Sequence, residues 1–484
     1  TQTISITNNC ENGIILTLTD TNPSNYVRNL RLYLPGYDET SGYWTTNYIN
    51  YFAQFEVARF AWGSGMYSQM TNWSERKQIN DLTWAAGDVT AEGVPYEAMV
   101  ELANAANTDL WVCVPAYANA NFELSMATLL RDSLDQNHKV WIEWANEQWN
   151  CGYYGYAGCE YLCALSNNCG DNQDPNYQGP TAPELYAQEV ISTTDNFISV
   201  FSSTGERDRL INVLGGQQSN WWQLDMAAQE IANNNKMGNI DVMSQGLYFN
   251  QHEDYDPLTP VLDQGMDAIM DAVELTMEDL FEPTSTMGIE IQNNITVANT
   301  YNKPMVIYEG GQHFTEWVGV TGQLVEDINN HPRMYDIYTE FLQLYDNLNL
   351  GTMIHYSSYG EYWRGEAFGL QEYYDQPLSE SHKLRAILDW QNSSLSNPDY
   401  TANPTATIYP NPANDYITIE MPEQFSDEFE LVLYDIRGRV CLHRTIIGTQ
   451  NQSLVLDISQ ESTGLYMLKF TSQDMSFTSK LLIR

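Results

Sequence analysis

Two glutamates stand at the ends of apolar runs, where a buried segment of chain meets polar surroundings. Glu147 closes the run VWIEWANE, and Glu309 follows VIY in KPMVIYEGG. A carboxylate at such a position costs free energy unless it is paired or faces a polar site. Two carboxylates on one cavity suit cleavage of a glycosidic bond, because one can protonate the departing oxygen while the other attacks the anomeric carbon. For either residue alone, a structural carboxylate that holds a loop is the competing interpretation.

Short apolar runs alternate with longer helical patterns through most of the chain, and this predicts repeated strand–helix units. The candidate strands cover residues 27–35, 55–62, 109–117, 139–146, 210–216, 240–249, 304–311 and 351–359. Such a series is typical of an α/β fold of the (β/α)8 TIM-barrel type. The alternative, an open doubly wound sheet, usually carries a glycine-rich phosphate loop after its first strand, and LPGYDETSGYW has no such pattern.

The predicted barrel positions the two glutamates. Reacting groups in this fold lie at the carboxyl ends of the strands. Glu147 ends the fourth predicted strand and Glu309 ends the seventh. We therefore expect both carboxylates to face one cavity and select them as the catalytic pair.

Three motifs carry a resemblance to a known group of enzymes. VWIEWANEQ resembles the Asn-Glu acid/base strand of the clan A retaining glycoside hydrolases, the cellulase- and mannanase-like superfamily. KPMVIYEGG resembles the nucleophile strand of that clan, and EVARF resembles its second strand with a terminal arginine. The resemblance covers residues 27–392 as an architecture and is specific only in these motifs. It implies a retaining glycosidase that hydrolyses O-glycosyl bonds of a β-linked polysaccharide, and we expect internal cleavage.

The resemblance also implies a role for five residues. Glu147 becomes the acid/base, Glu309 the nucleophile, and Asn146 a donor to the 2-hydroxyl group of the sugar. Arg59 would lie near Glu309, where its charge would keep that carboxylate ionised while Glu147 holds a proton. Tyr248, at the end of the sixth predicted strand, would donate a hydrogen bond to Glu309.

Departures from the clan pattern leave the family and the sugar open. His355-Tyr356 stands where the clan carries a tryptophan on its eighth strand, so His355 is a substrate-binding candidate. Trp363 is another, because it follows the same predicted strand beside Arg364. The 13 tryptophans and 32 tyrosines suit contact with the flat C–H faces of sugars. The competing interpretations are loop packing for Trp363 and a satisfied core histidine for His355.

Charge is strongly one-sided, with 63 acidic and 21 basic residues and a net charge of −42. Phosphate backbones are bound by clustered lysine and arginine, so no nucleic acid partner is expected. Few cations stand at predicted strand ends, which favours neutral glycans. The chain shows no His-x-His, His-Glu-x-x-His or EF-hand spacing, so we expect no metal and no cofactor. The expected partner is a polysaccharide or oligosaccharide, bound by a monomer. The rival function is a noncatalytic carbohydrate-binding surface protein on a barrel scaffold.

Four of the seven cysteines gather between the fourth predicted strand and the next helix, at Cys151, Cys159, Cys163 and Cys169. Two disulfides are the favoured interpretation, and three pairings are open. A zinc site is the alternative, although the paired close spacing of zinc ribbons is missing. The other cysteines, Cys10, Cys113 and Cys441, are expected to be ordinary packed thiols.

The pattern changes after residue 392. We assign residues 1–392 to the barrel, 393–404 to a polar linker, and 405–484 to a small all-β immunoglobulin-like sandwich of short alternating strands. IYPNPANDYITIEM, STGLYMLKF and the basic end SKLLIR resemble the type A sorting domain of the type IX secretion system of Bacteroidota. This implies the type IX machinery as a partner and a secreted or surface-attached protein outside the outer membrane. A spacer or sugar-binding module is the alternative.

Overall fold

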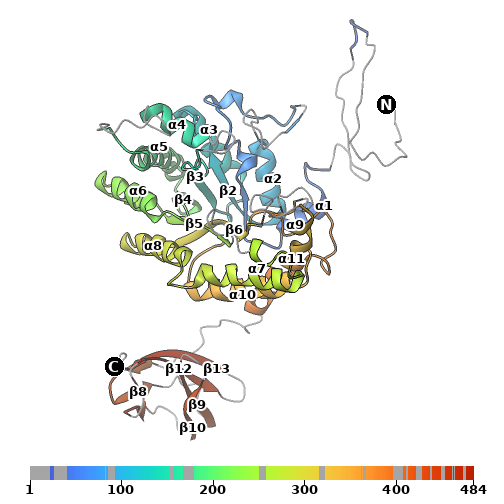
Figure 1. Ribbon diagram of the computed structural model, residues 1–484. Helices are drawn as coiled ribbons and strands as arrows, with labels where there is room; N and C mark the ends of the chain where they lie inside the picture. The colour runs from blue at the N-terminus through green and yellow to red at the C-terminus, as the bar shows by residue number, and fades with distance from the viewer. Residues whose placement is uncertain are drawn as a thin grey trace. The chain divides into compact units, whose positions relative to one another are not determined.

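The computed structural model divides into two compact units, Thr1–Trp390 and Gln391–Arg484 (Figure 1). The structure describes residues 22–26, 41–81, 83–84, 93–151, 157–166, 179–249, 258–314, 322–360, 362, 367–395, 407–409, 413–420, 428–435, 439–447, 453–459, 462, 464–471 and 476–483. No helix within these ranges has the length and apolar character needed to cross a membrane.

The first unit is built on one parallel sheet with the strand order β1-β2-β3-β4-β5-β6. These strands are β1 (Val57–Phe60), β2 (Asp109–Val114), β3 (Val140–Trp144), β4 (Leu210–Gly215), β5 (Val242–Phe249) and β6 (Met305–Gln312). Each lies within or overlaps a strand predicted from the sequence. Neighbours in the sheet are neighbours in the chain, which is the connectivity of repeated right-handed strand–helix–strand units.

Helices surround this sheet, as Figure 1 shows. They are α1 (Thr46–Phe52), α2 (Tyr96–Ala106), α3 (Ala120–Ser133), α4 (Ala157–Ser166), α5 (Ala182–Ser203), α6 (Trp221–Asn233), α7 (Met266–Phe281), α8 (Thr286–Thr300), α9 (Gly322–Asn329), α10 (Arg333–Leu348) and α11 (His382–Leu395). Capping residues mark the ends of several of these helices. Thr181 and Glu184 form a reciprocal capping box at the start of α5, and Asn107 ends α2 in the left-handed conformation.

Alternation along the strands separates two apolar layers. In β2, Leu110, Val112 and Val114 pack against the helices, whereas Trp111 belongs to the inner layer. The inner layer consists of Trp111, Trp141, Val213, Val242, Val306 and Tyr308. The rings of Trp111 and Trp141 stack with centroids 5.2 Å apart. Both faces of the sheet are therefore buried, as is typical of parallel sheets.

The predicted eighth strand, 351–359, forms no regular strand. It lies along β6 instead, where the N–H of Ile307 donates to the carbonyl of Thr352 (2.9 Å) and the N–H of Ile354 to that of Ile307 (3.0 Å). Met353 forms a parallel bridge with Ile307, and Tyr359 forms one with Gln371. Residues 357–360 pair with 368–371 instead, where the N–H of Ser357 donates to the carbonyl of Phe368 (3.3 Å) and the N–H of Gln371 to that of Ser358 (3.2 Å), so the pairing along β6 ends near Tyr356. The predicted first strand, 27–35, lies outside the described residues. The described part is thus a curved parallel sheet, a TIM-like half-barrel.

The second unit contains two small antiparallel sheets, ordered β10-β9-β12-β13 and β11-β8-β7. The strands are β7 (Thr407–Tyr409), β8 (Tyr416–Glu420), β9 (Glu428–Asp435), β10 (Val440–Ile447), β11 (Ser453–Asp457), β12 (Gly464–Thr471) and β13 (Ser476–Ile483). Buried residues from both sheets, including Ile419 and Leu468, form one core. The alternation predicted for this part of the chain is therefore confirmed.

Candidate active site

Arg59 joins the polar groups at the carboxyl-end edge of the sheet. Its side chain, 3% exposed, contacts Glu143 Oε2 (2.9 Å) and Glu309 Oε2 (3.1 Å). It also donates to Oδ1 of Asn146 (2.7 Å), and its guanidinium carbon lies 5.3 Å from the centre of the Tyr308 ring. A buried charge needs such partners, and the planar guanidinium can serve several at once. The predicted closeness of Arg59 and Glu309 is thus observed.

A β-bulge directs Glu309 to this site. Pairing between β5 and β6 shifts so that Gln245 pairs with Ile307 and Gly246 with Glu309, which leaves Tyr308 as the extra residue. A bulge re-aims the side chains of one strand. Tyr308 and Glu309 consequently both contact Arg59, although strict alternation would place consecutive residues on opposite faces.

Glu147 follows the end of β3 in an unusual backbone conformation. The φ angle is 52° at Ala145 and 44° at Glu147, in the left-handed region that costs a non-glycine residue about 1–2 kcal/mol. The N–H of Asn150 donates to the carbonyl of Glu147 (2.8 Å) and closes a turn. The hydroxyl of Tyr308 donates to Oε1 of Glu147 (2.8 Å) and fixes its side chain. Strain of this kind is concentrated at functional sites.

The two glutamates interact directly. Burial raises the pKa of Glu309 to about 8, and the negative charge of Glu147 adds to this. The charge of Arg59 acts in the opposite direction, whereas Glu143 and a hydrogen bond between the Glu147 and Glu309 carboxyl groups raise the pKa further. The sequence places Glu147 and Glu309 at the same edge of the sheet, and the structure brings their side chains together.

The raised pKa of Glu309 differs from the expectation drawn from the sequence. Arg59 was expected to keep Glu309 ionised. Its single positive charge is shared with Glu143, whose own pKa burial raises and Arg59 lowers. One cation therefore serves two carboxyl groups, and burial together with the negative charge of Glu147 outweighs it at Glu309. Glu309 therefore holds its proton near neutral pH.

The other three predicted site residues are Tyr248, His355 and Trp363. Tyr248 is buried, and burial followed by the charge of Glu309 raises its pKa well above the usual range. Within the described part of the chain its hydroxyl forms no hydrogen bond with Glu309. His355 lies beside β6, where its Nε2 contacts the hydroxyl of Tyr338 (2.9 Å) and burial lowers its pKa. Trp363 lies outside the described residues.

His355 also explains a glycine of β6. Gly311 has a φ of 120°, and a Cβ there would collide with the His355 ring. The imidazole is therefore packed against the strand that carries Glu309. Its buried Nδ1 has no hydrogen-bond partner within the described residues.

Sequence reasoning missed three residues of this site. Glu143 shares the inner face of β3 with Trp141, and the alternation in VWIEWANE was the available signal. In the sequence Tyr308 is simply part of an apolar run. The β-bulge that brings Tyr308 and Glu309 to the same arginine cannot be recognised from the sequence. Cys113 is buried as expected, with its Sγ 3.8 Å from an Arg59 nitrogen and 3.9 Å from Glu143 Oε2. Burial raises the pKa of this thiol, which stays protonated.

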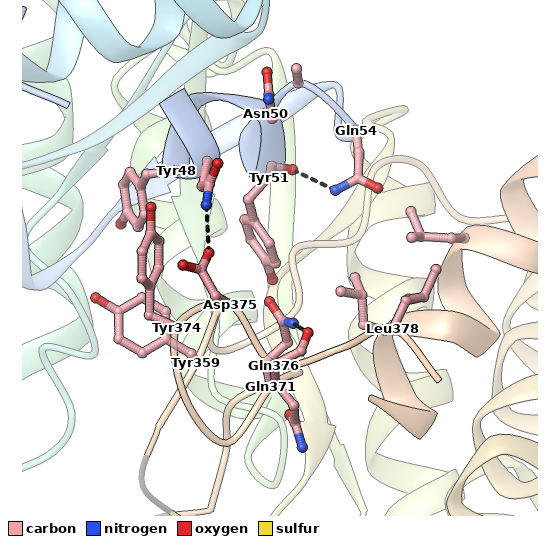
Figure 2. A pocket seen from close by; sticks show the side chains of 14 residues that line it. Tyr48, Asn50, Tyr51, Gln54, Tyr359, Gln371, Tyr374, Asp375, Gln376 and Leu378 are labelled. Atoms are coloured by element: carbon pink, nitrogen blue, oxygen red, sulfur yellow. Dashed lines mark hydrogen bonds between the residues drawn. The ribbon is translucent and has the colours of Figure 1, made fainter. Parts of the chain in front are cut away.

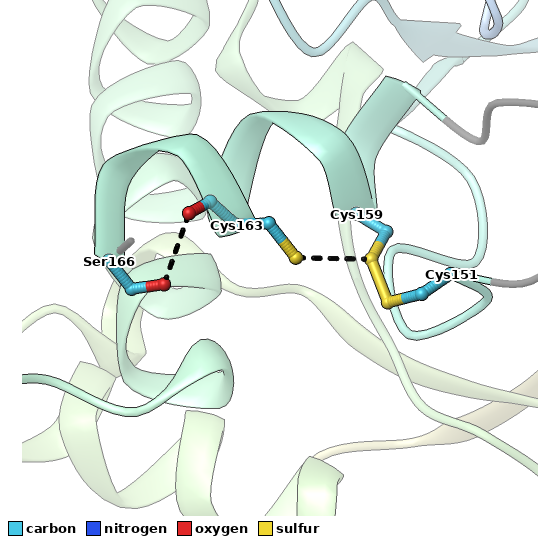
Figure 3. The surroundings of a disulfide bond; sticks show 4 residues. All are labelled: Cys151, Cys159, Cys163 and Ser166. Atoms are coloured by element: carbon cyan, nitrogen blue, oxygen red, sulfur yellow. Dashed lines mark hydrogen bonds between the residues drawn. A yellow bond between two sulfur atoms is a disulfide. The ribbon is translucent and has the colours of Figure 1, made fainter. Parts of the chain in front are cut away.

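A disulfide lies close to Glu147 in the chain. Cys151 is bonded to Cys159, at the start of α4, and the Cys163 sulfur lies 3.6 Å from that of Cys159 (Figure 3). One of the disulfides expected for this loop is thus present. Cys169 lies outside the described residues. The bond ties the turn that carries Glu147 to α4.

Comparison with known proteins assigns the second unit. Residues 407–484 match the family described as "Secretion system C-terminal sorting domain". This confirms the sorting domain predicted from the sequence and indicates secretion or attachment to the cell surface. It also implies interaction with the type IX secretion machinery. No curated protein sequence matches the chain significantly.

Several solved glycosidases are similar to the chain in structure. Bacteroides uniformis beta-glucuronidase 2 has 10% identity and a TM-score of 0.34, covering 90% of this chain and 42% of its own. The endo-beta-1,4-mannanase from Thermotoga petrophila has 11% identity and a TM-score of 0.31, covering 91% of this chain and 95% of its own. An endo-laminarinase from Formosa Hel1_33_131 has 11% identity and a TM-score of 0.30, covering 68% and 86%. This chain spans less than half of the glucuronidase. At these scores no activity can be transferred, so function is argued from the site.

Proposed function

We propose that the chain is a secreted retaining glycoside hydrolase that cleaves β-linked polysaccharide internally by double displacement. Glu147 is the acid/base, and Glu309 is the nucleophile. The observation that carries the proposal is that Tyr308 donates to Glu147 (2.8 Å) while the adjacent Glu309 contacts Arg59 (3.1 Å), which gathers both carboxyl groups at the carboxyl ends of β3 and β6. Retaining enzymes hold their carboxyl groups about 5–5.5 Å apart, whereas inverting enzymes leave about 6.5–9.5 Å for a water molecule. Glu147 and Glu309 acting by double displacement are expected to have the shorter of these separations.

Double displacement requires one proton on the pair, carried by Glu147 when the substrate is bound. In the first step the Glu309 carboxylate forms a bond to the anomeric carbon, the glycosidic C–O bond breaks, and Glu147 gives its proton to the departing oxygen. Water then attacks the anomeric carbon, the bond to Glu309 breaks, and Glu147 accepts a proton from the water. Because burial raises the pKa of Glu309, its proton has to leave before this attack, and Glu147 is the proposed acceptor.

Neighbouring groups support these roles. Tyr308 orients Glu147 through its hydroxyl, and Arg59 holds Glu309. Asn146 accepts from Arg59 through Oδ1, which leaves its Nδ2 group as the donor to the 2-hydroxyl of the sugar. Tyr248, close enough to feel the charge of Glu309, completes the set around the nucleophile. Arg59, Glu143 and Tyr308 act as positioning residues.

The surroundings favour a neutral polymer. Arg59 is buried and engaged by carboxylates and Asn146, so it offers no free charge to a sulfate or uronate group. Trp62 follows β1 and is 38% exposed, and Trp222 follows β4 and is 46% exposed. Exposed rings beyond separate strand ends suit a chain that extends on both sides of the cleaved bond. This supports internal cleavage.

The proposal extends to the fold class and the domain boundaries. The first unit is proposed to be a complete (β/α)8 barrel. We also propose that residues 1–392 form the barrel domain, 393–404 a linker, and 405–484 an immunoglobulin-like sandwich.

A trapping experiment tests the assignment. The full chain is incubated with activated 2-deoxy-2-fluoro glycosides of the gluco, manno and xylo series, and its peptides are analysed by mass spectrometry. A glycosyl adduct on the peptide containing Glu309, absent in Glu309→Gln, is the expected result. Labelling of another residue would contradict the nucleophile. Hydrolysis of a panel of neutral polysaccharides separates the enzyme from a noncatalytic binding protein, for which a buried carboxyl pair has no use.

A further inference from the structure

A hollow of the first unit lies between α1 and α11 and has a volume of about 850 Å³. Its described walls come from α1, the turn after it, Tyr359, the 371–378 loop and α11 (Figure 2). None of the described lining residues belongs to the carboxylate site. The volume lies in the range of about 300–1,000 Å³ that is usual for ligand sites.

Four tyrosines line this hollow, and two of them have exposed rings. Tyr359 is 44% exposed and Tyr374 is 37% exposed. Their ring centres lie 6.2 Å apart, and Tyr48 meets Tyr359 edge-on at 6.4 Å. Figure 2 shows these three rings on one side of Asp375. Tyr51 is held by the hydrogen bond from its hydroxyl to the carbonyl of Ser358 (3.2 Å). Such ring faces and edges suit the flat C–H faces of pyranoses.

Polar side chains stand around the rings, and internal hydrogen bonds hold them. Nδ2 of Asn47 donates to Oδ1 of Asp375 (2.8 Å), which links α1 to the opposite loop. Nε2 of Gln371 donates to the carbonyl of Gln376 (2.8 Å). The exposed amide of Asn50 adds both donors and acceptors. Amide and carboxylate groups in this arrangement suit the paired hydroxyls of a sugar.

The charge of the hollow restricts its ligand. No lysine or arginine is found among its described lining residues, and Asp375 is the one carboxylate there. The chain as a whole carries −42. A sulfated or uronic sugar would meet repulsion without a compensating cation. With a single carboxylate, the described lining also lacks the pair needed for double displacement. The hollow is thus suited to binding a neutral sugar chain and not to cleaving it.

We propose that the hollow between α1 and α11 is an accessory binding site for a neutral oligosaccharide, separate from the carboxylate site. The site would hold the polymer on the enzyme between cleavage events. The identification of its ligand as the substrate polymer rests on the proposed function, whereas the binding itself does not.

Calorimetry with the full chain tests this site. Glu309→Gln blocks turnover, and cellohexaose, mannohexaose, xylohexaose and laminarihexaose serve as neutral probes. For at least one probe we expect each chain to bind two oligosaccharide molecules, one at the carboxylate site and one in the hollow. Adding Tyr359→Ala and Tyr374→Ala should weaken one of the two sites by about tenfold or more, because the exposed ring contacts are removed. Leu378→Trp, which narrows the hollow without removing a ring, should do the same.

Tyr373→Ala is the matched control. Tyr373 is 47% exposed in the same loop and does not line the hollow, so two equivalents should remain. Unchanged two-site binding in both pocket variants would overturn the proposal, as would equal affinity for hexagalacturonate. Hydrolysis of the same polymers by the unmodified chain tests the proposed hydrolase activity separately. If hydrolysis occurs and one equivalent binds, the accessory site alone fails. If no polymer is hydrolysed while pocket-dependent binding persists, the hydrolase assignment alone fails.

Discussion

Tyr308 donates its hydroxyl to Oε1 of Glu147 at 2.8 Å, so the residue next to Glu309 in the chain holds the other carboxylate of the pair. The bulge between β5 and β6 makes this possible, because it lets Tyr308 and Glu309 contact the same arginine. One local irregularity of β6 thereby positions both proposed catalytic groups.

Replacing Tyr308 with phenylalanine should lower kcat while leaving the fold intact. The ring contact with Arg59 remains, but Glu147 loses the hydrogen bond that orients it. We expect a fall of about tenfold, which corresponds to about 1.4 kcal/mol in the barrier. Steady-state kinetics on a soluble substrate measure it. Tyr335→Phe is the control, because it removes a hydrogen bond to Asp389 (3.0 Å) on the surface. Equal kcat in both variants would show that Tyr308 only fills space.

Glu143→Gln should move the pH dependence of kcat/KM. Glu143 raises the pKa of Glu309 through its negative charge and competes with it for Arg59. Removing that charge lowers the pKa of Glu309, so the limb of the profile that reports the pair should shift toward acid. The variant keeps the shape of the side chain. An unchanged profile together with reduced stability would assign Glu143 a purely structural role.

Stability should fall as pH rises toward 8. The pKa of Glu309 is about 8 in the folded chain and near 4.5 when unfolded. Between these values the folded state binds more protons, so the free energy of unfolding decreases with increasing pH. Urea unfolding at pH 5 and pH 8 measures the slope. Glu309→Gln should reduce it, and the exposed Glu380→Gln should not. A pH slope that is unaffected by Glu309→Gln would contradict the raised pKa of Glu309 in the folded chain.

The cysteine cluster should contain a second disulfide. Cys151 is bonded to Cys159, so of the three pairings open from sequence, the one that joins Cys163 to Cys169 is left. Mass spectrometry of unreduced peptides should find both bonds, as is typical of an exported protein. Stoichiometric zinc, or a different pairing, would contradict the expectation. Loss of the Cys151–Cys159 bond should destabilise the turn beside Glu147 more than the rest of the first unit.

Particular residues show how far the sequence alone could lead. The strand ends that carry Glu147 and Glu309 were predictable, because apolar runs of strand length stop at both residues. The contact of Arg59 with Glu309 came from a motif resemblance. The partnership of Tyr308 with Glu147 could not be predicted, since it depends on a one-residue shift in pairing. The protonation of Glu309 was also beyond the sequence, because it depends on burial and on how Glu143 and Glu309 share Arg59.

The configuration of the first product tests the central claim most directly. Proton NMR of a polysaccharide or soluble substrate, recorded within the first turnovers, distinguishes the anomers before mutarotation mixes them. Glu147 and Glu309 acting by double displacement must release the β-anomer from a β-linked substrate. An α-anomer as the first product would show single displacement by water, which requires a wider separation of the carboxyl groups, and would contradict the assigned roles of both residues.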